Sequence, residues 1–161
     1  MKDTRIFRYV LEDAWGRMIS QLDVIKTDEA GEARGLYFDR RSSENGDTVA
    51  DSQRILLSSS DTEQIINIIE DHKEISEYRS LEFPHVLDGF INRFEFTINE
   101  NIHVISGFNV WAFLDNRYLQ IEGNPPTKGR NILDIFSSII TILEKNGMNS
   151  KYLQLKEEQL S

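Results

Sequence analysis

Hydrophobic and polar residues alternate in several short segments of the N-terminal part of the chain, and alternation with a period of two predicts β-strands. Residues 4–11, TRIFRYVL, are rich in β-branched and aromatic residues and predict the first strand. Residues 12–25 fit two patterns: a helical face through Trp15 and Ile25, or a hairpin with a loop at 12–16 and a second strand from about 17 to 25. Gly16 and the neighbouring strand signals favour the hairpin.

Polar residues dominate the next thirty positions. Residues 26–35 contain two glycines and predict a loop, and short apolar runs at 35–39 and 54–58 predict two further strands. The intervening segment, 40–53, is the longest polar stretch of the chain. Its composition fits either a mobile loop or a hairpin connection around Asn45-Gly46.

Two longer segments carry apolar residues at helical spacing. The first helix is predicted over about 61–77, opened by a capping box of Ser60 and Glu63, with the inward residues Ile65, Ile68, Ile69 and Ile75. The second is predicted over 130–146 and ends at Gly147, with the inward residues Ile132, Phe136, Ile139, Ile140 and Leu143. A shorter tail helix is predicted from Ser150.

Residues 83–121 hold much of the aromatic content and predict a meander. Asp88-Gly89 is a two-residue hairpin signal, and the strand after it alternates Phe90, Asn92, Phe94, Phe96 and Ile98 on one face. Further strands are predicted at 102–106, 110–114 and 118–121. The whole chain, residues 1–161, is therefore expected to form one α+β domain, an antiparallel sheet with the two main helices and the short C-terminal helix on one face.

Composition narrows the class of protein. The chain of 161 residues has no cysteine, which excludes a disulfide framework, a thiolate zinc site and a cysteine nucleophile and suits the cytoplasm. The longest uncharged run is too short and too polar to span ~30 Å of hydrocarbon, so neither a signal peptide nor a membrane span is predicted. With 27 acidic against 18 basic residues, the net charge of -9 argues against nucleic acid as a partner. The charge either serves solubility, the favoured interpretation, or attracts a basic partner.

Motifs for catalysis are missing from the sequence. There is no Walker loop, dinucleotide fingerprint, nucleophile elbow or His-Glu-x-x-His, so we predict no cofactor and no bound metal. His72, His85 and His103 stand apart, and His72 is expected to be a partly buried histidine with one hydrogen bond. Glu95 fits a shielded catalytic pocket less well than a cross-strand ion pair with a basic neighbour.

One basic segment at a predicted helix start has the composition of an anion site. Thr127, Lys128 and Arg130 surround a glycine where free backbone amides and the helix dipole favour negative charge. The simpler interpretation, which we favour, is that Thr127 or Asn131 caps the helix while the cations stay solvated.

Aromatic residues on the sheet fall into two groups. The phenylalanines around Phe94 are expected in the core, with Arg93, Glu95 and Thr97 on a solvated face. Trp111, with Asn109 and Phe113, is predicted on the outer face as an interface anchor if Ala112 faces the helices.

These observations predict a small, soluble, acidic intracellular protein that binds a macromolecule without catalysis, as an inhibitor or an immunity or antitoxin-like protein does. Its expected partner is a protein, and a basic one, bound through the sheet face that the helices leave uncovered. Two alternatives stay open: an enzyme with an unrecognised carboxylate or histidine site, and a module that oligomerises through its sheet.

Overall fold

The structure is a computed structural model, and it describes residues 3–13, 18–27, 33–43, 46–78, 80–81, 91–108 and 127–148. Within these residues the elements follow in the order β1 (Thr4–Glu12), β2 (Met18–Lys26), β3 (Ala33–Ser43), β4 (Gly46–Leu57), α1 (Ser59–Glu70), the 3-10 helix η1 (Lys73–Glu77), β5 (Ser80–Leu81), β6 (Ile91–Ile98), β7 (Asn101–Phe108) and α3 (Thr127–Lys145).

The strands form one sheet in the order β4-β3-β2-β1-β6-β7-β5. Neighbouring strands are antiparallel except β5, which pairs parallel to β7 over two residues. The predicted α+β class with an antiparallel sheet is therefore confirmed. The first strand lies in the middle of the sheet, between β2 and β6. The Asp88-Gly89 turn, the strands at 110–114 and 118–121 and the tail helix lie outside the described residues.

Two hairpins build the N-terminal half of the sheet. β1 and β2 pair antiparallel, so the hairpin favoured for residues 12–25 is confirmed. β3 and β4 pair from Ala33–Leu57 to Ser43–Gly46, so the polar stretch is a hairpin and the loop interpretation of residues 40–53 is wrong. Both strands are longer than their apolar runs, because a ladder of backbone hydrogen bonds continues through polar residues.

β7 also exceeds its predicted length. The sequence predicts a turn at 107–109, but Gly107 pairs with Asn92 and Phe108 pairs with Ile91. Gly107 additionally pairs with Leu81 of β5. The cross-strand pairing on both sides holds the glycine extended, so its turn tendency does not decide the local structure.

Helix α1 begins two residues before the predicted capping box. The N-cap is Ser58, whose Oγ accepts a hydrogen bond from the backbone N–H of Asp61 (3.1 Å). The prediction of a capping box formed by Ser60 and Glu63 is therefore wrong. Leu57 is the last, buried residue of β4, so the chain is free to turn immediately after it, and the first serine there satisfies the free amides.

The predicted first helix is also too long, since α1 ends at Glu70 and residues 73–77 form η1. Ile69 and Ile75 are both buried. Six residues of regular α-helix would rotate Ile75 by about 240° from Ile69 and turn it away from the core. The break between the helices brings Ile75 back to the apolar side.

Helix α3 begins at Thr127, before the predicted start at residue 130, and its end is as predicted. Gly147 has φ +100°, and its N–H donates to the carbonyl of Glu144 while the N–H of Met148 donates to that of Leu143. These two bonds define a Schellman motif, which requires a left-handed residue and therefore favours glycine.

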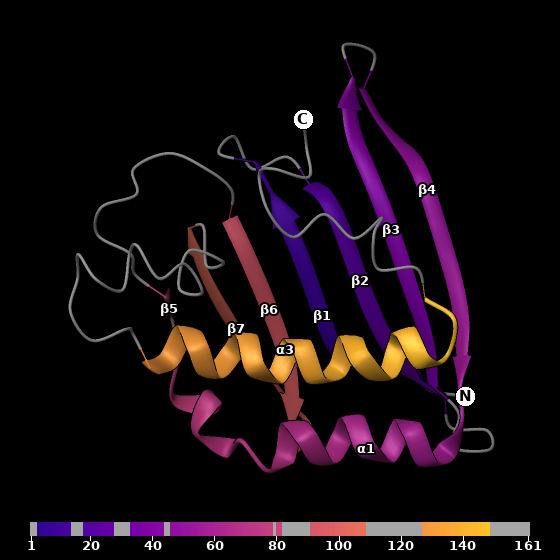
Figure 1. Cartoon of the computed structure of the whole chain (residues 1–161). Helices are drawn as coiled ribbons and strands as arrows, with labels where there is room; N and C mark the ends of the chain where they lie inside the picture. The colour runs from indigo at the N-terminus through magenta and orange to yellow at the C-terminus, as the bar shows by residue number, and fades with distance from the viewer. Residues whose placement is uncertain are drawn as a thin grey trace.

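Both helices lie side by side across the same face of the sheet, and they run in opposite directions (Figure 1). Phe136 of α3 is at the centre of the core, with its ring 4.8 Å from that of Tyr9, 5.7 Å from that of Phe94 and 5.9 Å from that of Phe7. Along β6, Asn92, Phe94, Phe96 and Ile98 are buried and the residues between them are half-buried, which is the predicted alternation. All five residues predicted to face inward from the second helix are buried.

Candidate functional site

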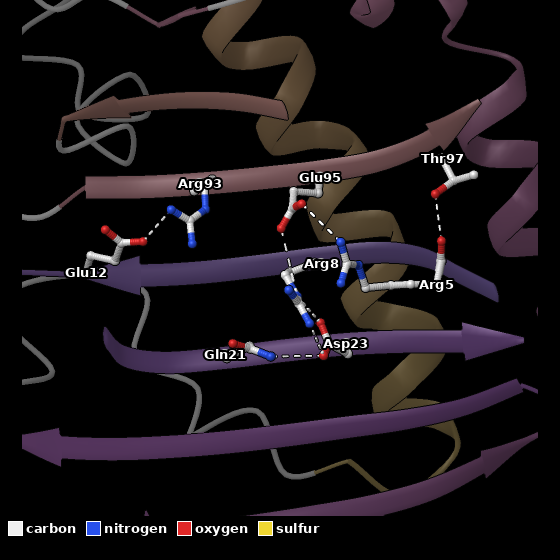
Figure 2. A network of polar contacts seen from close by, with 8 residues as sticks. All are labelled: Arg5, Arg8, Glu12, Gln21, Asp23, Arg93, Glu95 and Thr97. Atoms are coloured by element: carbon white, nitrogen blue, oxygen red, sulfur yellow. Dashed lines mark hydrogen bonds and ion pairs between the residues drawn. The ribbon is translucent and has the colours of Figure 1, made fainter. Parts of the chain in front are cut away.

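The sheet face turned away from α1 and α3, here called the outer face, carries a network of charged side chains. It comes from the three central strands β2, β1 and β6 and consists of Arg5, Arg8, Glu12, Gln21, Asp23, Arg93 and Glu95 (Figure 2). These residues occupy the outer positions because Phe7, Tyr9, Phe94 and Phe96 take the alternate positions that face the helices.

Arg8 and Asp23 form the centre of the network. They are direct cross-strand neighbours, and the guanidinium donates two hydrogen bonds to the carboxylate, from Nε to Oδ1 (2.6 Å) and from Nη2 to Oδ2 (2.9 Å). Gln21 Nε2 also donates to Asp23 Oδ2 (2.9 Å). Asp23 is only 4 % exposed, so these bonds replace the water that the carboxylate loses.

Glu95 joins the network from β6. Its Oε1 lies 3.1 Å from Nη2 of Arg5, and its Oε2 lies 3.9 Å from Nε of Arg8. Of the two interpretations of Glu95, the cross-strand ion pair is the one that the geometry matches. Arg93, two residues earlier on the same strand, binds a different carboxylate, that of Glu12, at 2.6 Å. The two predicted site residues therefore belong to separate ion pairs.

The neighbours of Arg8 in this network favour its positively charged form. Its hydrogen bond to Asp23 raises the pKa of the guanidinium above the ordinary value, burial opposes the shift, and the charges of Asp23 and Glu95 add to it. Arginine does not deprotonate in proteins, so Arg8 serves as a permanent cation. The network sets three arginines against three carboxylates, and its formal charge is zero.

The helical layer is acidic by comparison. Residues 58–78 contain six acidic residues and one lysine, whereas α3 contains two acidic residues against Lys128, Arg130 and Lys145, so the acidic excess comes from α1 and η1. Exposed carboxylates are those of Glu63, Asp71, Glu74, Glu77, Asp134 and Glu144. Much of the negative charge of the described residues therefore lies on the helices rather than on the outer face.

Two polar contacts tie the antiparallel helices together at their ends. Asp61, in the first turn of α1, accepts a hydrogen bond from Asn146 Nδ2 (3.0 Å) and lies 3.4 Å from Lys145 Nζ. The bond from Asn146 lowers the pKa of Asp61 below its ordinary value, burial opposes this, and Lys145 lowers the pKa further. A carboxylate at a helix N-terminus beside a lysine at a C-terminus also suits both helix dipoles.

Asn131 makes the contact at the other end. Its Nδ2 donates to Glu74 Oε1 (2.9 Å) and to the hydroxyl of Tyr78 (3.2 Å). The hydrogen bond from Asn131 to Glu74 is the largest cause of the lowered pKa of the Glu74 carboxyl. Asn131 is the fifth residue of α3, so its predicted role as the N-cap is wrong.

The basic segment predicted as an anion site forms the first turn of α3. Thr127, Lys128 and Arg130 are all helical, so the helix begins three residues before its predicted start at Arg130; nothing is described of these three side chains. Trp111, Asn109 and Phe113 also lie outside the described residues, and their roles stay predictions.

His72 makes a contact within its own helical segment. His72 is half-buried, and its Nδ1 lies 2.6 Å from the carbonyl oxygen of Ile68, which matches the predicted single hydrogen bond. Nowhere in the described ranges do three or more potential metal ligands of the His, Cys, Asp and Glu types come together. None of the helices described is long and apolar enough to cross a membrane.

Sequence reasoning missed the Arg8–Asp23 pair. The signal was partly present, because both residues fall on the polar positions of two strands that were predicted to form a hairpin. The register was not predictable, since the connection between Glu12 and Met18 is longer than the two-residue turns that fix pairing.

Comparison with known proteins adds no relative: no family model matches the chain, and no curated protein is significantly similar to it.

Proposed function

We propose that this protein is a non-enzymatic binding module for a basic protein partner, in the manner of an inhibitor or an immunity or antitoxin-like protein. The observation that carries the proposal is the separation of charge between the two sides of the molecule. The exposed helical layer has an excess of carboxylates, whereas the carboxylates of the outer network are each paired with an arginine.

The helical layer supplies the attraction in this proposal. An uncompensated acidic surface speeds the approach of a basic protein at low ionic strength and disfavours acidic partners and nucleic acid. Trp111, with Asn109 and Phe113, is predicted on the outer face, so it is not assigned to this contact. Glu95 and Arg93 are assigned to strand pairing and not to partner binding, because each forms a cross-strand ion pair.

The test starts with affinity capture from a native lysate at low and at high salt, followed by rate measurements with the purified partner. A double variant, Glu63→Lys with Glu77→Lys, reverses two exposed charges and should lower the association rate constant by roughly tenfold and flatten its salt dependence. The matched control, Glu63→Asp with Glu77→Asp, keeps both charges and should bind like the unaltered protein.

Two results would contradict the proposal. One is a captured partner that is itself acidic and binds more tightly as salt is raised. The other is an association rate that the reversed charges on α1 and η1 leave unchanged.

A further inference from the structure

We propose that the outer face of the sheet is a self-association surface, on which a second copy of this chain packs face to face. The proposal is independent of the basic partner, because it uses the opposite side of the sheet from the helical layer. Three features of the described residues support it: the exposed apolar side chains, their places in the register, and the charge balance.

Large exposed hydrophobic residues lie on the outer face at both ends of the sheet. Ile102 and Val104 of β7 are 54 % and 45 % exposed, and Leu56 of β4 is 63 % exposed. Their strand neighbours Ile105 and Leu57 point to the helices and are buried, which assigns the exposed residues to the outer face. Single exposed hydrophobics are ordinary, so their arrangement decides their meaning.

The register places Leu56 and Ile102 at opposite ends of one row across the sheet. Leu56 pairs with Arg34, Arg34 with Ile25 and Ile25 with Arg5. The carbonyl of Arg5 accepts a hydrogen bond from Thr97 Oγ1 (2.6 Å), and Thr97 pairs with Ile102.

A two-fold axis parallel to the strands, between β1 and β2, would reverse this row in the second copy. Leu56 of each copy then faces Ile102 of the other. In the next row the same axis places Arg8 of one copy opposite Asp23 of the other, since these two residues flank the axis. The face is thus complementary to itself at the apolar pair Leu56–Ile102 and at the charged pair Arg8–Asp23.

Charge favours this face over the helical layer. Two copies of a chain with net charge -9 repel each other, and the repulsion is smallest where the approaching surfaces are neutral. The outer network has formal charge zero, and the register adds the basic residues Arg34 and Arg54 to the same face, so packing does not bring the acidic excess of the two copies together.

The size of the face suits a stable interface. Six long strands at a spacing of ~4.8 Å and about eight residues per strand at ~3.4 Å give roughly 24 Å by 27 Å. Packing of two such faces would remove on the order of 1,300 Å² from water, which exceeds the ~1,000 Å² expected of a specific interface.

The first measurement is the mass of the full chain in solution by sedimentation equilibrium over a range of concentrations. We expect a dimer of twice 18.7 kDa that becomes tighter as salt screens the residual repulsion. Binding of a basic partner should weaken with salt, so the two proposals predict opposite salt dependences and can fail separately. A monomer at every concentration would overturn the self-association.

Charge-swap variants test the geometry. Leu56→Lys alone and Ile102→Glu alone should each weaken the dimer at least roughly tenfold, because each introduces unpaired charges into the interface. A mixture of the two variants should restore a heterodimer, in which one contact is Lys against Glu and the other is the original Leu56 against Ile102.

Ser138→Glu, which adds one charge to an exposed position of α3, is the control and should leave the dimer unchanged. Far-ultraviolet circular dichroism checks that each variant is folded. A dimer that neither strand variant weakens would show that another surface is used, and weakened variants that fail to form the heterodimer would overturn the proposed axis.

Discussion

The two faces of the sheet carry different kinds of side chain. Towards the helices, alternate residues of β1 and β6 form an aromatic cluster around Phe136, in which Phe7, Tyr9, Phe94 and Phe96 are fully buried. Away from the helices, charged residues at the intervening positions form ion pairs with each other and with Asp23 of β2.

The two faces contribute different properties: the aromatic face mainly stabilises the fold, and the ionic face mainly sets the surface charge. The aromatic side stabilises the fold by removing large apolar areas from water. The ionic side contributes less net free energy, because exposed ion pairs are weak, but its carboxylates are balanced by arginines, while the helical layer keeps the acidic excess. One acidic chain therefore presents two electrostatically different surfaces.

The largest effect should come from truncating the aromatic side. Phe94→Ala should lower the free energy of unfolding by about 3–5 kcal/mol, because it opens a cavity beside Phe136. Gln64→Ala, at an exposed position of α1, is the control and should change it by less than about 0.5 kcal/mol. Urea titration measures both, and a small effect of Phe94→Ala would contradict the core assignment.

Breaking the centre of the ionic side should have an intermediate effect. Arg8→Met keeps much of the side-chain volume but leaves Asp23, 4 % exposed, without its two strongest hydrogen bonds. We expect a loss of about 2–3 kcal/mol, less than for a fully buried pair, because the Arg8 side chain is 26 % exposed.

Arg93→Met is the matched control for that variant. The Arg93 side chain is 38 % exposed, so its pair with Glu12 should contribute less than about 1 kcal/mol. Equal losses for Arg8→Met and Arg93→Met in urea titrations would show that burial of the carboxylate does not set the strength of these pairs.

The smallest effect concerns the contact between the helix ends. The pKa of Asp61 is lowered in the folded state, so its contribution to stability is present above the unfolded pKa of about 3.9 and is lost as the pH falls through the folded pKa. Asp61→Asn should be less stable than the unaltered protein at pH 7, and the difference should shrink below about pH 4. Glu63→Gln, on the same helix, is the control. A difference that is constant from pH 7 to pH 2 would contradict the linkage.

The sequence predicted the elements better than their connections. The alternation at Phe94 and Phe96, the apolar stripe around Phe136 and the stop at Gly147 were all readable, because each depends on a local pattern. Three predictions were wrong, because strand pairing and core contacts override local signals at these positions. They are the capping box at Ser60, the helix end at residue 77 and the turn at Gly107.

The candidate surfaces were less predictable still. The pairs Arg8–Asp23 and Arg93–Glu12 depend on which strands are neighbours, and the placement of β1 between β2 and β6 has no local signal. Net charge was known from composition, but its concentration on the helical layer follows only from the fold.

The central claim, that the acidic excess lies on the helical layer and not on the outer face, can be measured without a partner. Amide proton relaxation is recorded at low salt with a cationic and with a neutral nitroxide of similar size. The account predicts that the cationic probe is enriched over the neutral one near Glu63, Glu77 and Asp134, and that the two probes act equally near Arg8, Asp23 and Glu95. Equal enrichment of the cationic probe on both sides of the sheet would contradict it.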